Sequence, residues 1–286
     1  MTYNQTQRYF YSTLSSFYSK NELASIWKVY LELVLKIDRI FFISNPQDQI
    51  EEEKIVELQN VINRLTKHEP IQYIIGKAWF CDSVFNVNPS VLIPRPETEE
   101  LVYKVCENII ENNTHILDIG TGSGCIAISI KKIKPGSTVI AVDISEVALD
   151  LAASNATRIL GNTSVSFINR DVLNPDFAQI FNIKFDLIVS NPPYIPEVET
   201  ENIKENVLNF EPHLALFCGD DPLLFYKAIT HHAKQLLKPG GLLFFEIHED
   251  FGTEVKKLLI QEKFKEIELI RDMQNKNRII KARYYT

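Results

Sequence analysis

The sequence predicts an α/β protein in which helices flank a mostly parallel sheet, preceded by a small domain made only of helices. From residue 115 onward, seven short apolar runs alternate with segments of helical periodicity, the pattern of βα units in a parallel sheet. Before Gly76 the sequence has no glycine, and its apolar residues recur at three- and four-residue spacings. We therefore expect seven strands in the larger domain and only helices in the first 75 residues.

The length and composition suit a soluble globular protein with one large and one small domain. The chain has 286 residues, of which 45% are hydrophobic and 23% are charged. Its formal net charge of -7 argues against a protein that coats nucleic acid through the phosphates. No apolar stretch approaches the length of a membrane-spanning helix, and the polar N-terminus lacks a signal-peptide core. We expect a cytoplasmic protein without membrane contact.

The cysteines and histidines indicate neither a disulfide framework nor a metal site. The four cysteines are far apart and form no C-x-x-C pair: Cys81, Cys106, Cys125 and Cys218. We expect them to be reduced and mostly buried. The neighbouring His231 and His232 fall on a predicted helix with no second cluster of ligands, so we expect surface or hydrogen-bonded side chains and no bound metal.

Three segments are predicted in chain order: a helical domain over residues 1–75, a β-hairpin linker over 76–90 and the larger domain over 91–286. In the first, one apolar stripe runs from Leu23 to Leu35 and another from Ile50 to Leu65, with a loop at Asn45-Pro46. This segment has no cluster of residues that suggests chemistry, so we interpret it as a substrate-docking domain. In the second, apolar residues alternate with short polar breaks.

A glycine-rich turn is the first sign of a binding site. Prolines keep the stretch before Glu97 extended, and the acids that follow begin a helix expected to reach Ile110. A strand over 115–119 then enters a turn with alternating glycines, which opens a helix: Gly120, Thr121, Gly122, Ser123 and Gly124. Glycines let the backbone approach a ligand, and the helix start offers free N–H groups. Cys125 holds the position of the third glycine of G-x-G-x-x-G, and Asp118 favours a cationic ligand over a pyrophosphate.

Carboxylates at the ends of the next strands complete a cofactor site. Asp143 ends the second strand, where an acid can accept hydrogen bonds from both ribose hydroxyls of an adenosine. Asp171 follows the third strand and can accept a hydrogen bond from the adenine amino group, with the apolar Val172 against the adenine ring. Alone, each acid is an ordinary loop carboxylate. Their common order and spacing predict a site for S-adenosylmethionine rather than a nicotinamide cofactor.

The fourth strand, over 185–190, leads into Asn191-Pro192-Pro193-Tyr194. The prolines end the strand because they cannot donate backbone hydrogen bonds, and ligands bind at this end of parallel strands. The asparagine amide, the proline carbonyls and the tyrosine ring suit a planar amine or amide. An ordinary strand-to-loop turn is the alternative. We predict that Asn191, Pro192, Pro193 and Tyr194 bind substrate, that Asn191, Pro192 and Tyr194 are catalytic, and that Asn191 also borders the cofactor.

The rest of the chain continues the alternation. A polar and mobile loop is expected over 197–209, then a helix over 222–237 that stops at Lys238-Pro239-Gly240-Gly241. A fifth strand is expected over 242–247, a helix near 251–262, and the last two strands near 264–270 and 278–285.

The larger domain resembles the protein-glutamine N(5)-methyltransferases that modify bacterial peptide chain release factors. The glycine turn alone indicates a methyltransferase, and Asn-Pro-Pro-Tyr is shared with DNA adenine-amino methyltransferases. The segments that are specific to the family are Ile93-Pro94-Arg95-Pro96-Glu97-Thr98-Glu99 and Phe210-Glu211-Pro212-His213-Leu214-Ala215-Leu216.

The sequence departs from the family at two places. The family often has Glu-x-Gly followed by Gln where this chain has Glu246-Ile247-His248, a position remote from the motifs, so we expect a change in local packing only. Val172 stands where some relatives have an aromatic, which is expected to weaken stacking on adenine.

The resemblance implies a Rossmann-like, S-adenosylmethionine-dependent methyltransferase that modifies the glutamine of the Gly-Gly-Gln loop in release factors and leaves S-adenosylhomocysteine. In that reading the Asn191 amide and the Pro192 carbonyl hold the substrate amide, and Tyr194 packs on its plane. We expect a monomer without direct nucleic-acid contact. The alternatives are a methylase of a ribosomal-protein glutamine, an adenine-amino methyltransferase, which the acidic net charge disfavours, and a non-catalytic docking protein that binds the cofactor.

Overall fold

The computed structural model describes residues 1–161 and 165–285. The chain separates into two compact units. The first contains Met1–Lys77 and Lys204–Phe210, and the second contains Ala78–Ile203 and Glu211–Thr286. The chain therefore leaves the second unit for one short segment and then returns to it.

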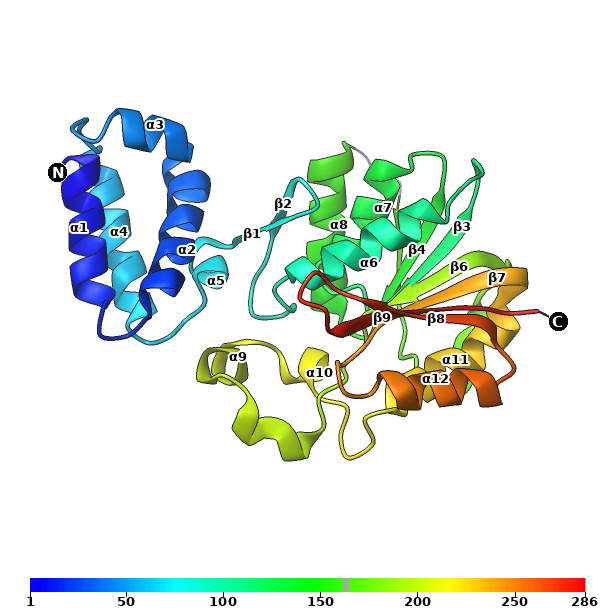
Figure 1. The fold of residues 1–286 in the computed structure, drawn as a ribbon. Helices are drawn as coiled ribbons and strands as arrows, with labels where there is room; N and C mark the ends of the chain where they lie inside the picture. Colours follow the sequence, from blue (N-terminus) through cyan, green and yellow to red (C-terminus); the bar gives the residue numbers. More distant parts are fainter. Residues whose placement is uncertain (162–164, 286) are drawn as a thin grey trace. The chain divides into compact units, whose positions relative to one another are not determined.

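The first unit is helical, as the apolar spacing predicts (Figure 1). Its helices are α1 Tyr3–Leu14, α2 Lys20–Tyr30, α3 Arg39–Ser44, α4 Glu52–Leu65 and α5 Ile71–Ile75, with α9 Glu205–Phe210 from the returning segment. Thr2 and Ser19 begin α1 and α2 with capping boxes, which satisfy backbone N–H groups that the first turn leaves free. The predicted stripe of α2 is buried at Leu23 and Trp27 and continues into a π-helical turn over Leu31–Leu35.

The second unit begins with a hairpin and contains a seven-stranded sheet. The hairpin, β1 Lys77–Phe80 with β2 Ser83–Asn86, forms a two-stranded sheet where the alternating pattern predicts one. In the large sheet the strand order is β5-β4-β3-β6-β7-β9-β8. The strands are β3 His115–Ile119, β4 Thr138–Asp143, β5 Val165–Asn169, β6 Phe185–Ser190, β7 Leu237–Glu246, β8 Lys265–Arg271 and β9 Asn277–Arg283.

This topology confirms the mostly parallel α/β fold. Strands β3 to β7 are parallel to one another, and β9 runs antiparallel between β7 and β8. The order of the strands reverses between β3 and β6, which are neighbours in the sheet although β4 and β5 separate them in the chain. In open α/β sheets, ligands bind at such a reversal, beyond the carboxyl ends of the strands.

Helices cover both faces of the sheet (Figure 1). Successive strand residues point to opposite faces of the sheet. On one face, Ile116 packs with α6 Pro96–Glu107, α7 Cys125–Ile133 and α8 Glu146–Leu160. On the other face, Leu117 packs with α11 Leu224–Leu236 and α12 Gly252–Gln261. Phe244 and Phe245 of β7 divide between the faces in the same way. Both faces of the central strands are therefore apolar, and this explains their unbroken hydrophobic runs.

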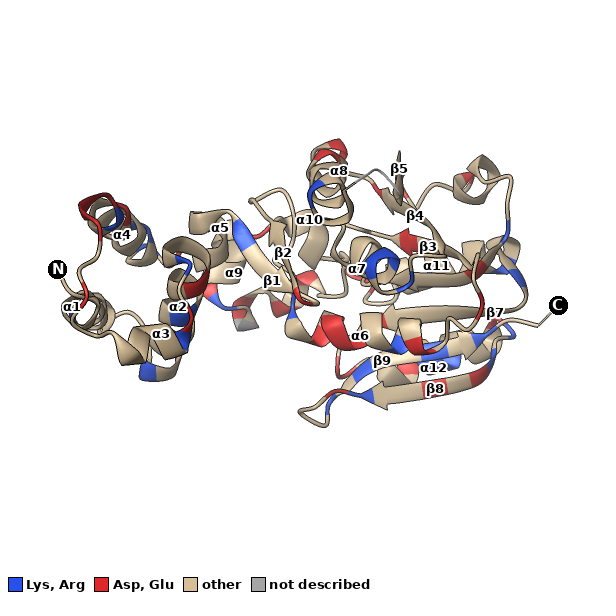
Figure 2. Ribbon diagram, turned by 90° about the horizontal axis from the view of Figure 1, so that it is seen from above, with Lys and Arg blue, Asp and Glu red and all other residues tan. Residues whose placement is uncertain are grey.

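The edge strand β8 carries charges of both signs, and its neighbour β9 carries only basic ones (Figure 2). The ammonium of Lys281 lies 2.7 Å from the Glu268 carboxylate, and the Arg283 guanidinium lies 2.8 Å from Glu266. Charged side chains on an edge strand such as β8 discourage pairing with another sheet.

Three element boundaries differ from the sequence predictions. The expected loop over 197–209 contains a 3-10 helix over Glu197–Asn202 and most of α9. The 3-10 helix is held by local i to i+3 hydrogen bonds, which need no apolar stripe in the sequence. Helix α6 ends at Glu107 rather than at residue 110, and the next apolar residue, Ile109, is buried without being helical. Strand β7 begins at Leu237, the last residue of the predicted helix, rather than at residue 242, since Phe185 pairs with Leu237 before a register shift.

Two further observations concern the residues that the structure describes. None of their helices is both long and apolar enough to span a membrane. All four cysteines are free thiols, and three of them are buried, as predicted.

Candidate active site

A cavity of about 440 Å³ lies at the carboxyl ends of β3, β4 and β6, where the strand order reverses. It is bordered by the glycine turn (residues 120–124), the ends of β4 and β5, the Asn-Pro-Pro-Tyr turn (residues 191–194), the segment before α6 and the start of α10 His213–Leu216. This volume is typical of sites that bind a small molecule. The strand-end motifs of the sequence therefore meet at one site.

The glycine turn reaches the cavity through its backbone. Gly120, Gly122 and Gly124 all have positive φ angles, which a residue with a side chain rarely adopts. A Cβ atom on Gly122 would meet no atom within 4 Å, so glycine leaves open space there, whereas on Gly124 it would lie 2.7 Å from the Ile128 side chain. Residues 120–123 line the cavity, and Gly124 instead permits close packing behind it.

Asp118 braces the glycine turn from behind. The Thr121 hydroxyl donates a hydrogen bond of 2.6 Å to its Oδ2 atom. The side chain is fully buried, and this burial raises the pKa of Asp118 to about 7. Asp118 is not among the residues that line the cavity, so its contact with the site runs through Thr121, which does line it.

Asp143 joins the end of β4 to the glycine turn. Its Oδ2 atom accepts a hydrogen bond of 2.8 Å from the Gly122 N–H, and its Oδ1 atom accepts one of 2.9 Å from Ser145. Burial raises the pKa of this carboxyl. Because each carboxylate oxygen has a second lone pair, Asp143 can still accept hydrogen bonds from a ligand in the cavity that it lines.

Asp171 and Val172 also line the cavity, beyond the end of β5. The Asp171 carboxylate accepts a hydrogen bond of 2.8 Å from the Leu173 N–H, which fixes the loop. The Val172 carbonyl lies 3.0 Å from Nε2 of the buried His232, so the structure confirms that this histidine has a hydrogen-bond partner. The side chain of Val172 is mostly buried and offers an apolar wall.

The Asn-Pro-Pro-Tyr turn contributes its first three residues to the cavity wall, and Tyr194 is not among the lining residues. The Asn191 Nδ2 atom donates to the Thr98 hydroxyl over 3.3 Å, and that hydroxyl donates to Glu246 Oε2 over 2.6 Å. The Tyr194 hydroxyl lies 3.5 Å from Glu246 Oε1. Burial raises the pKa of Glu246 to about 7 and raises that of Tyr194 as well.

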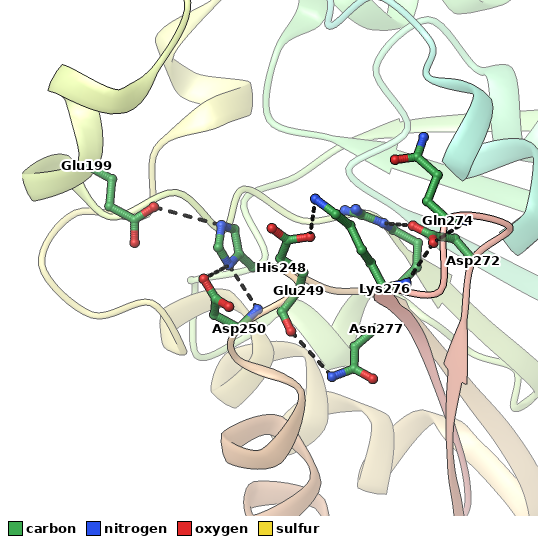
Figure 3. A network of polar contacts seen from close by, with 9 residues as sticks. Glu199, His248, Glu249, Asp250, Asp272, Gln274, Lys276 and Asn277 are labelled. Carbon is green, nitrogen blue, oxygen red and sulfur yellow. Dashed lines mark hydrogen bonds and ion pairs between the residues drawn. The ribbon is translucent and has the colours of Figure 1, made fainter.

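The departure at His248 is close to the site, contrary to expectation. The His248 ring packs edge-on to Tyr194, with 5.8 Å between the ring centroids, and against Phe251 at 5.0 Å. Figure 3 shows its two nitrogens directed toward carboxylates, with Glu199 at 3.8 Å and Asp250 at 3.9 Å. The prediction that this position is remote from the motifs was wrong, because β7 lies beside β6 in the sheet.

The two family-specific segments meet at a buried glutamate that the sequence did not single out. Glu211 accepts a hydrogen bond of 3.2 Å from the Ile93 N–H and one of 2.5 Å from Arg95. Its side chain is only 1% exposed, while that of Arg95 is 34% exposed. An acid between an aromatic residue and a proline is the signal that could have identified it. Arg95 and Pro212 both line the cavity, so this ion pair builds one corner of the site.

The cavity residues fit S-adenosylmethionine. Asp143 has acceptors to spare for hydroxyl groups, the glycine turn leaves room for close approach, and Ile144, Val147 and Val172 provide apolar surface for a ring. In the described parts of the chain, no three histidine, cysteine, aspartate or glutamate side chains are grouped as metal ligands would be.

Comparison with protein families divides the chain into two matched regions. Residues 5–76 match the model described as the PrmC N-terminal domain. Residues 98–212 match the model of the methyltransferase small domain.

Curated relatives match nearly the whole chain. A release factor glutamine methyltransferase from Flavobacterium psychrophilum is 39% identical over 96% of this chain and 96% of its own. One from Bacteroides thetaiotaomicron is 40% identical over 98% of this chain and 99% of its own. Among solved structures, the hMettl16 catalytic domain in complex with the MAT2A 3'UTR hairpin 6 shares the fold, with a TM-score of 0.56 at 16% identity. That match covers 82% of this chain and 83% of that one.

Proposed function

The chain belongs to the release factor glutamine methyltransferase family, and from this premise we propose its reaction. It transfers the methyl group of S-adenosylmethionine to the side-chain amide nitrogen of the glutamine in the Gly-Gly-Gln motif of peptide chain release factors. The observation that carries the proposal is that residues 191–193 line the same cavity as the glycine turn and Asp143. A group that presents acceptors to an amide therefore shares a cavity with a site for an adenosine.

The residues that hold the cofactor in this proposal come from three strand ends. Asp143 accepts hydrogen bonds from the ribose hydroxyls, Asp171 accepts from the adenine amino group, and Val172 packs on the ring. Residues 120–123 approach the cofactor through their backbone, and Asn191 borders it. When bound, S-adenosylmethionine supplies a methyl group on a positively charged sulfur, a strong electrophile.

The residues of the Asn-Pro-Pro-Tyr turn then have to orient a poor nucleophile. The lone pair of an amide nitrogen is delocalised into its carbonyl, so alignment is the main work left to the protein, and positioning of this kind can supply roughly 7–11 kcal/mol. The Asn191 side-chain oxygen and the Pro192 carbonyl accept hydrogen bonds from the two N–H groups of the substrate amide. Both acceptors stabilise the positive charge that develops on nitrogen. Tyr194 does not line the cavity, so its packing on the amide plane is the part of the proposal that rests on the family resemblance alone.

The names of the relatives favour this substrate over the alternatives. Proteins at 39% and 40% identity over nearly the whole chain are named for release factors. We therefore prefer a release factor to a ribosomal-protein glutamine or an adenine as substrate, and turnover to a purely docking role. In the same proposal residues 1–75 form a docking domain for the release factor, 76–90 the linker, and the monomer is the active species.

The direct test is methylation of a purified bacterial release factor. The protein is incubated with S-adenosylmethionine and the release factor, and peptides are examined by mass spectrometry. We expect one added methyl group on the glutamine of Gly-Gly-Gln, and none on a release factor whose glutamine is replaced by alanine. Methylation of a different residue, or no methylation at all, would refute the proposed substrate.

A further inference from the structure

Asn191 is connected to a buried carboxylate through a single threonine hydroxyl. Asn191 follows β6, Thr98 lies in the first turn of α6, and Glu246 is the last residue of β7. The distances are 3.3 Å from Asn191 Nδ2 to Thr98 Oγ1 and 2.6 Å from that hydroxyl to Glu246 Oε2. Thr98 is 3% exposed and Glu246 is 1% exposed, so water competes little for these bonds.

When Glu246 is ionised, the donors and acceptors of this chain of hydrogen bonds can be ordered in one way only. Burial raises the pKa of Glu246 to about 7, so at pH 8 its carboxyl is mostly ionised and only accepts. The single hydrogen of the Thr98 hydroxyl is then donated to Glu246, and a lone pair is left for Asn191. If the Asn191 side-chain amide were rotated by half a turn, its oxygen would face the Thr98 hydroxyl oxygen with no hydrogen between them.

This order decides which atom of Asn191 is free for a ligand. The side-chain oxygen accepts no hydrogen bond from any residue within the described part of the chain, and Asn191 and Thr98 both line the cavity. We propose that Thr98 is a positioning residue, which together with Glu246 keeps the Asn191 side-chain oxygen available to accept a substrate N–H. The role rests on the proposed function, because it matters only for a substrate that donates.

The positioning has a clear physical benefit. The last torsion of an asparagine side chain is broad and nearly two-fold, so an unrestrained amide would present its NH2 group for part of the time. That NH2 would face the substrate N–H donor to donor. A fixed amide orientation avoids this arrangement and needs no reorganisation when charge develops on the substrate.

The test compares three substitutions of Thr98 at pH 8 in the full-length protein. Thr98→Val keeps the shape but removes the hydroxyl, while Thr98→Ser and Thr98→Ala differ from each other mainly by that hydroxyl. The matched control is Thr230→Val, since Thr230 is also fully buried, lies outside the cavity lining, and has a hydroxyl without a partner among the described residues. Calorimetry measures S-adenosylmethionine affinity, single-turnover kinetics measure methyl transfer to a release factor, and thermal unfolding checks the fold.

We expect Thr98→Val and Thr98→Ala to bind S-adenosylmethionine as the wild type does and to transfer methyl about tenfold more slowly, the effect of one hydrogen bond. Thr98→Ser and Thr230→Val should transfer at nearly the wild-type rate. If Thr98→Val does not fold, the Ser and Ala pair decides the question. Equal rates for Ser and Ala, or parallel loss of cofactor affinity and rate, would overturn the positioning role. A wild-type chain that leaves the release factor unmethylated would instead refute the proposed substrate.

Discussion

The two sides of the cavity are built in different ways. On the side of the glycine turn, contacts join residues close in sequence, such as Thr121 with Asp118, or residues of neighbouring strands, such as Gly122 with Asp143. On the side of the Asn-Pro-Pro-Tyr turn, Asn191 depends on Thr98, which lies far away in the chain. In our proposal the cofactor side therefore depends on one turn and its neighbouring strand, whereas the orientation of Asn191 on the substrate side depends on a helix and a further strand, α6 and β7.

The largest effect expected from this comparison is on turnover. Asn191→Ala should retain S-adenosylmethionine and lose about two to three orders of magnitude in single-turnover rate, because a positioned acceptor of developing charge is lost. Asn191→Asp keeps an acceptor but adds a negative charge near a cationic cofactor, so it should bind the cofactor at least as well while turnover falls. Calorimetry and rapid-quench kinetics measure the two quantities. Loss of cofactor affinity in both variants would make Asn191 a cofactor residue and remove the distinction between the two sides.

A second experiment tests whether burial of the Glu246 carboxylate, on the substrate side, lowers the free energy of unfolding. The pKa of Glu246 is raised from 4.5 to about 7 by burial, so the folded protein holds this proton more tightly than the unfolded chain does. The resulting stabilisation is present at low pH and is lost as the pH rises toward 7. Glu246→Gln cannot ionise. Between pH 5 and pH 8 the wild type should therefore lose about 2 kcal/mol more of its unfolding free energy than Glu246→Gln does.

Urea unfolding at both pH values measures this difference. Asp118, whose pKa is also raised to about 7, is unchanged in the variant and cancels in the comparison. If the two proteins respond to pH in the same way, the Glu246 carboxyl does not titrate in this range.

The cofactor side gives the third prediction. Asp143→Ala should weaken S-adenosylmethionine binding by about tenfold or more, because hydrogen bonds to a charged acceptor are lost. The single-turnover rate at saturating cofactor should change far less than it does in Asn191→Ala. Calorimetry with a folded variant is the measurement. An unchanged affinity would rule out the proposed ribose contact.

The smallest effect concerns the corner where the two family-specific segments meet. A double-mutant cycle with Arg95→Ala and Glu211→Gln should give a coupling energy of about 1 kcal/mol, since Arg95 is partly exposed and solvent screens the pair. Thermal or urea unfolding of the four proteins supplies the cycle. A coupling energy near zero would show that the ion pair between Arg95 and Glu211 contributes little to stability.

The strand and helix assignments of the larger domain follow from sequence because its strands are buried on both faces. Continuous apolar runs and the glycine turn then identify β3 to β7 and the strand-end carboxylates. Sequence did not identify Thr98, Glu211 or Glu246 as parts of the site, because each acts through a partner on another element. For the same reason His248 was expected to be remote from Tyr194, although the neighbouring strands β6 and β7 bring their rings together.

The division of the chain between the two units has a consequence for synthesis on the ribosome. Residues 1–77 emerge first, but the segment Lys204–Phe210 that belongs to the same unit is made only after β3 to β6. Domains generally fold as units as the chain emerges, the N-terminal one first. The apolar cluster of the N-terminal unit contains only residues between Phe10 and Ile75, so this core can form while the strands of the sheet are still being made, and Lys204–Phe210 then joins a bundle whose core already exists.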